Sequence, residues 1–483
     1  MNYFCRMRYK FLVLLTLLIA ASTAKAQEKW SLLKCVEYAM ANNISVKQVD
    51  LQSKIAELTL KQSKYGQLPN LNFNGGPGFN SGRNQDPTTF SLITQSYLSA
   101  SVQLQSSADI FNWFSKRNTI AANEWELQAA KANTDKLKND IALSVANLYL
   151  QILLGMEQEK IAGIQLQQSQ AQLINTRKLV DAGNLPELNA ANLEAQVALD
   201  SSNVITAKGS VIQNVLSIKA FMGLDAATLF EIETPAAEKI FVGKLADLQP
   251  ETVYALAIIN MPQQRFNDFK LKAAQKTSAA ARGGLYPTIS AFGSLNSSFI
   301  NSKRPIYQPT GTYSSNIFSP QVDINGVIYK VTDPNFVEVG ENGIPFFSQI
   351  DQNFRQSVGL SLSIPIFNGL GARTNYQKSK INIRNQELQK ELDNQTLKQD
   401  IYKAYNAAMV AFEKLNAGEK SLQAAERTFY YAQKRYDVGM LGTFDLITSQ
   451  NNQFTARLQN ALNQYDYIFK MKVLEFYKGQ GLK

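Results

Sequence analysis

The chain has 483 residues, of which 45% are hydrophobic and 18% are charged, and its formal net charge is +10. It contains no histidine, which excludes Ser-His-Asp and Cys-His nucleophilic sites and removes the commonest metal ligand. The basic residues are scattered rather than clustered, so the charge does not indicate nucleic-acid binding. We find no paired carboxylates and no glycine-rich phosphate loop, and we expect no enzymatic activity, no cofactor and no metal.

Residues 1–26 have the pattern of a secretory signal peptide. Three basic residues precede the apolar run 11–21, and Ala24-Lys25-Ala26 is a small-x-small cleavage site. The apolar run is too short to span a membrane as a helix. Cleavage would start an exported mature chain at Gln27. It would remove four basic residues and no acid, lowering the formal net charge from +10 to +6. Cys35 would then be the only cysteine, so no intramolecular disulfide is expected.

A first repeat is predicted over 27–222, opening with a helix at 31–65 and continuing into a β-hairpin at 68–112. Apolar and polar residues alternate strictly in this hairpin. Alternation over about ten residues is typical of a transmembrane strand, apolar towards lipid and polar towards a lumen. A half-buried strand of a soluble sandwich is the alternative, but such strands usually run only about five or six residues. The alternating positions of the return strand are Leu98, Ala100, Val102, Leu104, Ser106, Ala108 and Ile110.

Two long helices are predicted to complete this repeat, at 113–182 and 186–222. The first would extend on the order of 100 Å at 1.5 Å per residue. Its apolar residues recur every three or four positions and form one narrow stripe, so it should pack side by side with other helices, as in a coiled coil. The turn between the two helices contains Gly183, which can take the left-handed conformation that ends a helix.

Residues 223–250 are predicted to link this repeat to a second one, over 251–483. The second hairpin, at 285–368, differs from the first by an extra segment at 300–352. We predict this segment to be one large loop at the outer end of the hairpin. The helices expected in the second repeat are the opening helix at 249–283 and the long helices at 369–437 and 443–478, the last two joined by a turn at Gly439.

The two repeats are copies of one another. Residues 34–78 align with 252–296 at a constant shift of 218, and residues 97–222 align with 353–478 at a constant shift of 256. A register fixed on both sides of one insertion indicates a duplicated supersecondary unit. Two hairpins supply four strands, which cannot close a barrel alone, and an open edge in lipid leaves backbone groups unpaired. Two chains would give eight strands with an interior filled by side chains, whereas three would give twelve and leave a lumen.

This pattern resembles the TolC family of outer-membrane efflux channels over essentially the whole mature chain. The resemblance rests on the duplicated helix–β-hairpin–long helix–helix layout, on Pro-Ile-Phe-Asn-Gly at 365–369, and on Tyr-Asp-Val-Gly at 436–439 followed by Phe-Asp-Leu at 444–446. It implies an α/β membrane channel: a homotrimer with a twelve-stranded barrel in outer-membrane lipid, continued by an α-helical coiled-coil tunnel in the periplasm. The implied partners are a periplasmic adaptor and an inner-membrane pump.

The resemblance also implies which residues close the periplasmic entrance. Tyr436 and Asp445 match the family's gate tyrosine and first aperture aspartate, and Asn189 is the equivalent of Asp445 in the first repeat. Leu441 stands where the family has a gating arginine and Thr448 where it has a second aspartate, so we expect no salt-bridge latch. The helix-tip turns implied to contact the adaptor are Gly183, Leu185, Gly439 and Leu441.

Each role has a structural alternative. Asp445 lies where an acid at a helix start favours the macrodipole, and Tyr436 can serve interhelical packing. The whole chain has functional alternatives as well. The implied function is a passive export duct for small molecules in a tripartite efflux system. The alternatives are a duct dedicated to type I protein secretion and a non-conducting periplasmic coiled-coil scaffold.

Overall fold

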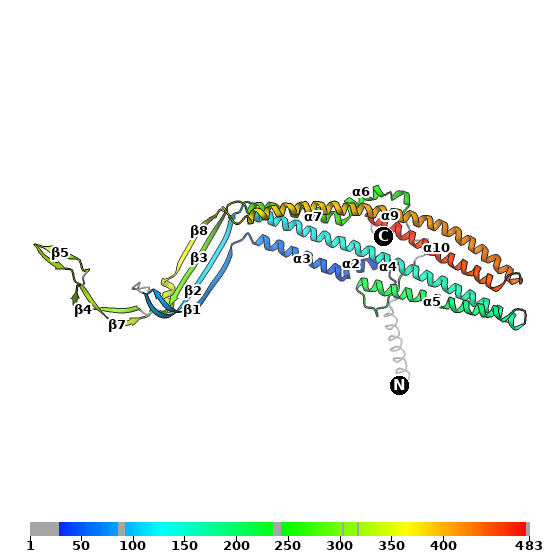
Figure 1. Ribbon diagram of the computed structural model, residues 1–483, viewed down its shortest axis with the longest axis horizontal. Coiled ribbons are helices and arrows are strands. Elements are labelled where there is room, and N and C mark those ends of the chain that lie inside the picture. Colours follow the sequence, from blue (N-terminus) through cyan, green and yellow to red (C-terminus); the bar gives the residue numbers. More distant parts are fainter. Residues whose placement is uncertain (1–28, 86–91, 235–242, 302–303, 316–317, 480–483) are drawn as a thin grey trace, which may run out of the picture. The chain divides into compact units, whose positions relative to one another are not determined.

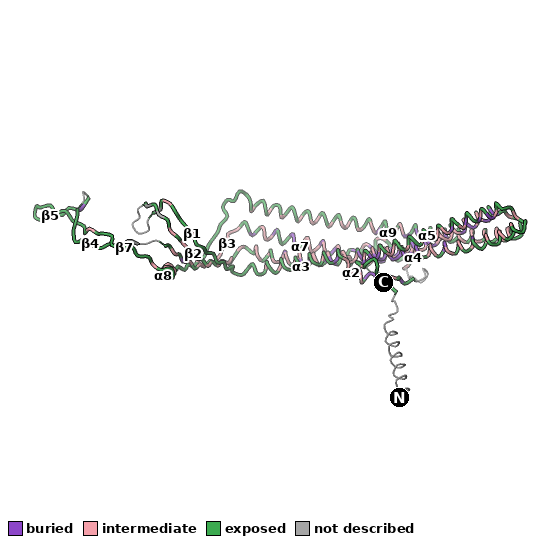
Figure 2. Tube along the Cα trace, turned by 90° about the horizontal axis from the view of Figure 1, so that it is seen from below, coloured by how far each residue is buried: buried purple, intermediate pink, exposed green. Residues whose placement is uncertain are grey.

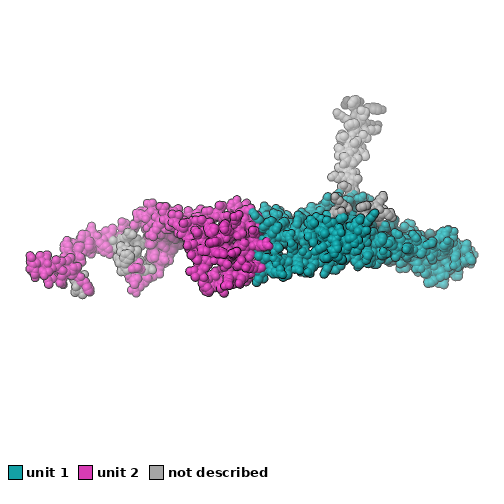
Figure 3. Space-filling view, turned by 90° about the horizontal axis from the view of Figure 1, so that it is seen from above, with its two compact units in different colours: residues 1–58, 123–274, 381–483 teal, residues 59–122, 275–380 magenta. Residues whose placement is uncertain are grey.

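The computed structural model describes residues 29–85, 92–234, 243–301, 304–315 and 318–479. The predicted signal peptide lies outside the described residues. The chain divides into two compact units, coloured separately in Figure 3. Unit 1 comprises residues 1–58, 123–274 and 381–483, and unit 2 comprises residues 59–122 and 275–380. Each unit therefore takes segments from both repeats.

Unit 2 contains a four-stranded antiparallel sheet (Figure 1). Its strands are β1 (Asn70–Gln85), β2 (Leu92–Phe111), β3 (Thr288–Ile300) and β8 (Arg355–Ser363), and they lie in the order β1-β2-β3-β8. The second strand of the first hairpin thus pairs with the first strand of the second hairpin. This arrangement leaves β1 and β8 at the two edges of the sheet.

The register of the sheet separates an apolar face from a polar face. Directly opposed residues share a face. Phe73 opposes Leu104, which opposes Leu295 on the next strand, whereas the next position along the strands brings together Asn72, Gln105 and Ser294. The apolar and polar residues that alternate along each strand therefore lie on opposite faces of the sheet. The apolar face is open in the described chain, since Phe73 is 70% exposed. Most of β1 is coloured as exposed in Figure 2.

The prediction of one large loop over 300–352 is corrected by the structure, because this segment contains regular secondary structure. Strand β4 (Arg304–Ser314) pairs with β7 (Asp333–Asn342), and β5 (Gln321–Ile324) pairs with β6 (Val327–Lys330). A short helix, α8 (Phe346–Gln352), leads back to β8. The sequence signal for the β5–β6 hairpin is its Asn-Gly turn, whose two residues have φ values of 55° and 85°, as a type I′ turn requires.

The opening helix of each repeat is broken in two, which corrects the single helices predicted at 31–65 and 249–283. The first repeat has α2 (Leu32–Asn42) and α3 (Ile44–Tyr65), and the second has α6 (Pro250–Asn260) and α7 (Pro262–Gly283). The breaks fall at equivalent positions, because Asn43 and Met261 differ by the repeat shift of 218.

Two different residues produce these equivalent breaks. Asn43 leaves the helical conformation with ψ 131°, and its side-chain oxygen accepts a hydrogen bond from the backbone N–H of Ser45 at 2.8 Å, as a cap at the start of α3. Met261 has ψ 129° and precedes Pro262, whose ring disfavours the helical conformation of the residue before it. An asparagine cap in the first repeat and a proline in the second thus interrupt the opening helix at the same position.

The long helices are α4 (Ser115–Asp181), α5 (Glu187–Met222), α9 (Gly371–Asp437) and α10 (Thr443–Tyr477). The first and last residues of each helix lie within two residues of those predicted, at 113–182, 186–222, 369–437 and 443–478. None of the helices that the structure describes is long and apolar enough to cross a membrane.

The duplication extends to the backbone where each hairpin gives way to a long helix. Trp113 and Phe114 have positive φ values of 49° and 61°, and so do their counterparts Gly369 and Leu370, at 62° and 64°. Both helices then begin with an N–H of the first helical residue donating to the asparagine carbonyl three positions earlier, at 3.0 and 3.2 Å. The same reversal of the chain therefore precedes α4 and α9.

The main hydrophobic core of unit 1 is formed chiefly by α2, α4, α5 and α10, and its buried residues are among those coloured as buried in Figure 2. Within the predicted linker, Ile232 forms an isolated parallel β-bridge with Trp30. Tyr149 ties this bridge to the core, because its hydroxyl donates to the carbonyl of Glu233 at 2.6 Å and lies 3.2 Å from that of Trp30. A second core joins α6, α9 and α10 around Ile401, Met471 and Leu474.

Cys35 lies in the first core and provides a test of its packing. The thiol is fully buried, and burial raises its pKa to about 12 because the thiolate would lose its hydration. We expect no labelling of the native protein by a thiol reagent at pH 8 and complete labelling after unfolding. The matched control is Leu33→Cys, on the exposed side of the same helix, which should label in the native state. Rapid labelling of native Cys35 would show that α2 is not packed as described.

Candidate functional site at the helix tips

Two turns join the long helices, α4 to α5 and α9 to α10 (Figure 1). The two turns have the same hydrogen-bond pattern. At the first turn, the N–H of Gly183 donates to the carbonyl of Val180 at 2.8 Å and that of Asn184 to Leu179 at 2.9 Å. At the second, Gly439 donates to Tyr436 at 2.9 Å and the next N–H donates to Arg435 at 2.8 Å. These are Schellman motifs, and they require the left-handed conformation that Gly183 and Gly439 adopt at φ 75° and 74°.

Tyr436 lies in the last turn of α9 and contacts the first repeat. Its hydroxyl lies 2.8 Å from the hydroxyl of Thr176 on α4, which is fully buried, and 3.5 Å from that of Thr443 at the start of α10. The predicted gate tyrosine therefore joins three helices by hydrogen bonds. This contact is compatible with both of its expected roles, gating and interhelical packing.

Asp445 and Asn189 occupy the same position of their helices. Asp445 is exposed and is the third residue of α10, after Gly442, which provides no side-chain cap. Asn189 is the half-buried third residue of α5, and its N–H donates to the carbonyl of Pro186 at 3.0 Å. The helix-start role of Asp445 fits this position, and its exposure leaves the carboxylate free to meet ions.

The most exposed apolar residues at the tips are not the predicted ones. Leu185 and Leu441 are half-buried, whereas Leu188, Val438, Met440 and Phe444 are each about two-thirds exposed or more. We call these last four residues the tip patch. Sequence reasoning missed them because they follow no helical stripe. Their signal was the occurrence of large apolar residues in and beside glycine turns, where solvent exposure is expected.

A polar seam connects the four long helices just inside the tips. It consists of Ser169 and Thr176 on α4, Gln196 and Asp200 on α5, Tyr436 on α9, and Gln450 and Asn451 on α10. The hydroxyl of Ser169 donates to the carboxylate of Asp200 and lies 3.2 Å from the amide nitrogen of Gln450. The amides of Gln196 and Asn451 exchange two hydrogen bonds of 3.0 and 3.1 Å.

The carboxylate of Asp200 is the most deeply placed charge in this seam. The residue is 2% exposed, and the side-chain amide of Gln196 donates to its second oxygen at 2.9 Å. Hydrogen bonds from Ser169 and Gln196 replace the water that burial removes, which would otherwise make the charge costly. The sequence reading did not identify the seam, since its partners are as many as 281 residues apart.

One ion-pair cluster spans the first tip. The guanidinium of Arg177 on α4 pairs with Glu187 and, at 2.8 Å, with Glu194, both on α5. The hydrogen bond that the Arg177 guanidinium donates to Glu187, together with the negative charges of Glu187 and Glu194, raises the pKa of Arg177, which remains a cation. In the second repeat the equivalent residue is Gln433, whose amide instead accepts from Gln172 at 3.1 Å. The two tips are therefore alike in backbone and different in charge.

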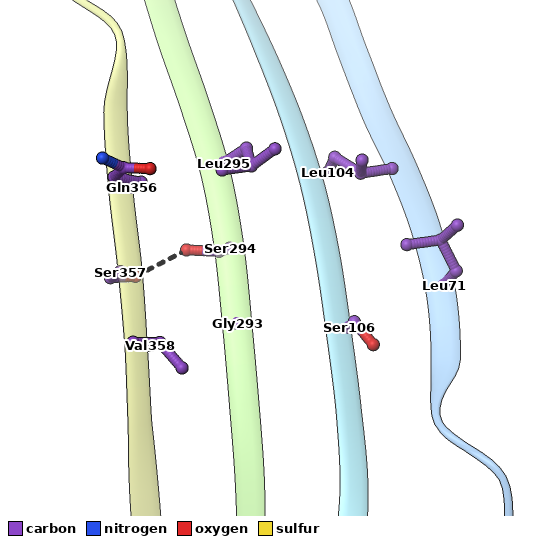
Figure 4. A pocket seen from close by; sticks show the side chains of 9 residues that line it. All are labelled: Leu71, Leu104, Ser106, Gly293, Ser294, Leu295, Gln356, Ser357 and Val358. Atoms are coloured by element: carbon purple, nitrogen blue, oxygen red, sulfur yellow. Dashed lines mark hydrogen bonds between the residues drawn. The ribbon is translucent and has the colours of Figure 1, made fainter.

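The sheet of unit 2 offers a second candidate surface. A hollow of about 540 Å³ is lined by side chains from all four strands (Figure 4). Leu71, Leu104 and Leu295 lie on three neighbouring strands, while Ser106 and Gly293 leave space between them. Its apolar lining suits hydrocarbon rather than a polar ligand. In the part of the chain that the structure describes, no cluster of acidic or cysteine side chains could hold a metal ion.

Comparison with protein-family models identifies the family. The model described as outer membrane efflux protein matches residues 36–224 and 348–477, which is well over half of the chain. The chain belongs to this family. The resemblance to TolC-type channels is thereby confirmed, and the chain is an outer-membrane protein. The match leaves out 225–347, which contains all of β4 to β7.

Solved structures of outer-membrane channels share the fold. CusC matches with a TM-score of 0.73 at 16% identity, covering 95% of both chains. VceC of Vibrio cholerae matches with a TM-score of 0.72 at 14% identity, covering 94% of this chain and 97% of VceC. CmeC of Campylobacter jejuni matches with a TM-score of 0.73 at 15% identity, covering 93% and 86%. Identities this low show the fold alone. A search of curated protein sequences gave no match.

The glycine turns can be tested by substitution. Gly439→Ala places a Cβ on a residue at φ 74°, so we expect the free energy of unfolding to fall by about 1–2 kcal/mol. The matched control is Gly209→Ala, an exposed helical position with no atom within 4 Å of the added carbon, where alanine should stabilise by up to about 1 kcal/mol. Thermal unfolding in detergent would measure both. An unchanged melting temperature for Gly439→Ala would contradict the turn geometry.

Proposed function

We propose that the protein is a trimeric outer-membrane duct that passively exports small molecules delivered by an inner-membrane pump through a periplasmic adaptor. The observation that carries the proposal is the four-stranded sheet, with an apolar face and two open edges, in a chain whose other elements are long helices. Such a sheet cannot remain open in lipid, because the unpaired N–H and C=O groups of its edges would cost several kcal/mol each.

The strand directions support closure between copies. The sheet is antiparallel throughout, so β1 and β8, its outer strands, run in opposite directions. If β8 of one copy pairs with β1 of the next, the closed sheet is antiparallel at every step. Three copies give twelve strands, enough for a lumen, whereas eight strands would leave an interior filled by side chains. Closure by symmetry then gives a threefold channel axis.

The polar face of the sheet fits the wall of an aqueous channel. Asn72, Gln105, Ser294 and Ser357 follow one another across the four strands, and the hydroxyls of Ser294 and Ser357 are 2.8 Å apart. Amides and hydroxyls can hydrogen-bond to water without attracting one sign of charge. A wall of this chemistry supports passage of varied solutes, so we assign the control of passage to the helical entrance.

The helix tips fit the roles of gate and docking surface. The tip patch of Leu188, Val438, Met440 and Phe444 presents apolar side chains to solvent, as a surface that contacts a partner does. We assign it, with the turns at Gly183, Leu185, Gly439 and Leu441, to the adaptor. We assign Tyr436, Asp445 and Asn189 to the periplasmic aperture, where Tyr436 would hold the closed arrangement through Thr176.

The proposal is tested by measuring assembly and conductance on one preparation. Native mass measurement in detergent should give three chains per particle, and planar-bilayer recording should show discrete channels. A stable monomer that retains its strands in lipid would overturn the architecture. A trimer that never conducts, even after the tips are loosened by Tyr436→Phe, would favour the scaffold alternative. Reconstitution with a pump and an adaptor separates small-molecule export from type I protein secretion.

The strand faces give a matched pair of substitutions. Leu362 lies on the apolar face opposite Ile289, and the preceding residue, Ser361, lies on the polar face opposite Ser290. Leu362→Arg should destabilise the trimer by about 2–4 kcal/mol if it faces lipid near the midplane, whereas Ser361→Arg should cost little. Heat dissociation of the trimer on gels would compare them. Equal penalties would mean that the apolar face is not turned towards lipid.

The aperture predicts ion selectivity. In a trimer, Asp445 would appear three times around the axis, and a ring of carboxylates attracts cations. We expect Asp445→Ala to reduce cation selectivity and the block by divalent and trivalent cations. The change should be modest, because Leu441 and Thr448 supply no second charged ring. The control, Asp181→Ala, removes one exposed acid from the end of α4 and should have little effect. Identical reversal potentials for wild type and Asp445→Ala would leave Asp445 with its helix-start role alone.

A further inference from the structure

The segment between β3 and β8 contains a second, separate β structure, which we call the arm (304–342). The arm has no counterpart in the first repeat and lies in the part of the chain that the family model does not match. Its outer part is the β5–β6 hairpin, closed by the Asn325-Gly326 turn. The carboxylate of Asp323 fixes this turn by accepting from the N–H of Gly326 at 2.8 Å. The hairpin is therefore a defined element.

The β5–β6 hairpin is amphipathic. Val322 opposes Tyr329 and Ile324 opposes Val327, so these four side chains share one face, which we call the hairpin face. They are 46–55% exposed, so the face is open in one chain. The opposite face carries the other four residues, Gln321, Asp323, Ile328 and Lys330. An isolated two-stranded hairpin is marginally stable in water and needs further strands or a cover for its apolar face.

The base of the arm is fixed to the sheet by α8. The hydroxyl of Ser297 donates to the carbonyl of Ile350 at 2.6 Å, and the amide of Asn353 donates to the carbonyl of Ser298 at 2.7 Å. Gln349 exchanges two hydrogen bonds with the backbone of Ile300, and the rings of Phe299 and Phe346 lie 4.9 Å apart. The chain therefore leaves and re-enters the sheet at one anchored place, at the end opposite its helices.

We propose that the hairpin faces of the three copies pack against one another, so that the arms form one shared cluster at the outer end of the channel. This inference rests on the proposed trimer. A barrel would hold the bases of three identical arms within a few nanometres, which corresponds to an effective concentration in the millimolar range. The hairpin face is uncharged and apolar, and packing of three such faces against one another would remove from water the apolar surface that one hairpin leaves open.

The net charge of the arm argues against a lipid surface as the partner that covers the hairpin face. From Arg304 to Asn342 the sequence contains four acids and two bases, so the arm carries a net negative charge. An anionic outer-membrane surface would repel it. A foreign protein partner would have to compete with two copies that the barrel already holds close by. The second and third copies of the chain are therefore the favoured occupants.

The experiment uses two neighbouring cysteine substitutions in the full chain. Val322→Cys lies on the hairpin face and Gln321→Cys on the opposite face of the same strand. The native Cys35 is buried and does not compete. Outer membranes are oxidised, and chain-to-chain disulfides are measured on non-reducing gels. Native mass measurement on the same preparations reports the trimer. We expect at least about fivefold more cross-linked dimer for Val322→Cys than for Gln321→Cys.

A second substitution tests the apolar contact itself. Ile324→Asp in the Val322→Cys background should reduce cross-linking at least about fivefold, whereas Ile328→Asp, on the opposite face, should leave it unchanged. Equal cross-linking from both faces, no cross-linking within an intact trimer, or a disulfide to a different protein would each overturn the inference while the proposed function stands. Absence of a trimer would overturn both.

Discussion

The structure depends on one constraint, the pairing of backbone groups at the two edges of the sheet. Strands β1 and β8 are the outer strands of a sheet whose apolar face suits hydrocarbon, and a bilayer offers no water to their free N–H and C=O groups. A single chain cannot satisfy them. Each strand of the sheet is continuous along the chain with a helix, so pairing between copies would also set how many helices meet around one axis.

Sequence reasoning predicted the elements whose signals are local and duplicated. Period-two alternation located the strands, and the glycines at 183 and 439 located turns that prove to have identical hydrogen bonds. Two features were missed although their signals were present. Pro262 predicts a break after Met261, and the repeat then predicts one at Asn43, where a side-chain cap replaces the proline. The Asn-Gly pair at 325–326 predicts a hairpin inside the supposed loop.

Other features could not be predicted, because they depend on contacts between distant residues. The pairing of β2 with β3, which makes one sheet from two hairpins, joins segments about 180 to 200 positions apart and leaves no pattern in either strand. The polar seam is similar. Ser169, Asp200 and Gln450 are unremarkable residues on helix surfaces until three helices bring them together. Tyr436 was identified through the family, but its partner Thr176 was not.

The polar seam holds the long helices together by a different kind of contact from the apolar cores, and this difference affects how easily the helices separate. The main core of unit 1 buries aliphatic side chains such as Ile152 and Ile218, and separating helices there would expose apolar surface at about 25 cal/mol per Å². At the seam, the helices are joined by hydrogen bonds between hydroxyls, amides and one carboxylate. Water can replace such partners, so each hydrogen bond between neutral groups contributes only about 0.5–1.5 kcal/mol net, and each one to the carboxylate about 1.5–3 kcal/mol. Among the described residues, the side-chain oxygen of Gln450 has no partner although it is buried, which lowers the cost of separation further. Apart from the buried Leu193 and Leu446, the contacts of the seam are polar, and we therefore expect them to hold the long helices together less strongly than the apolar cores do.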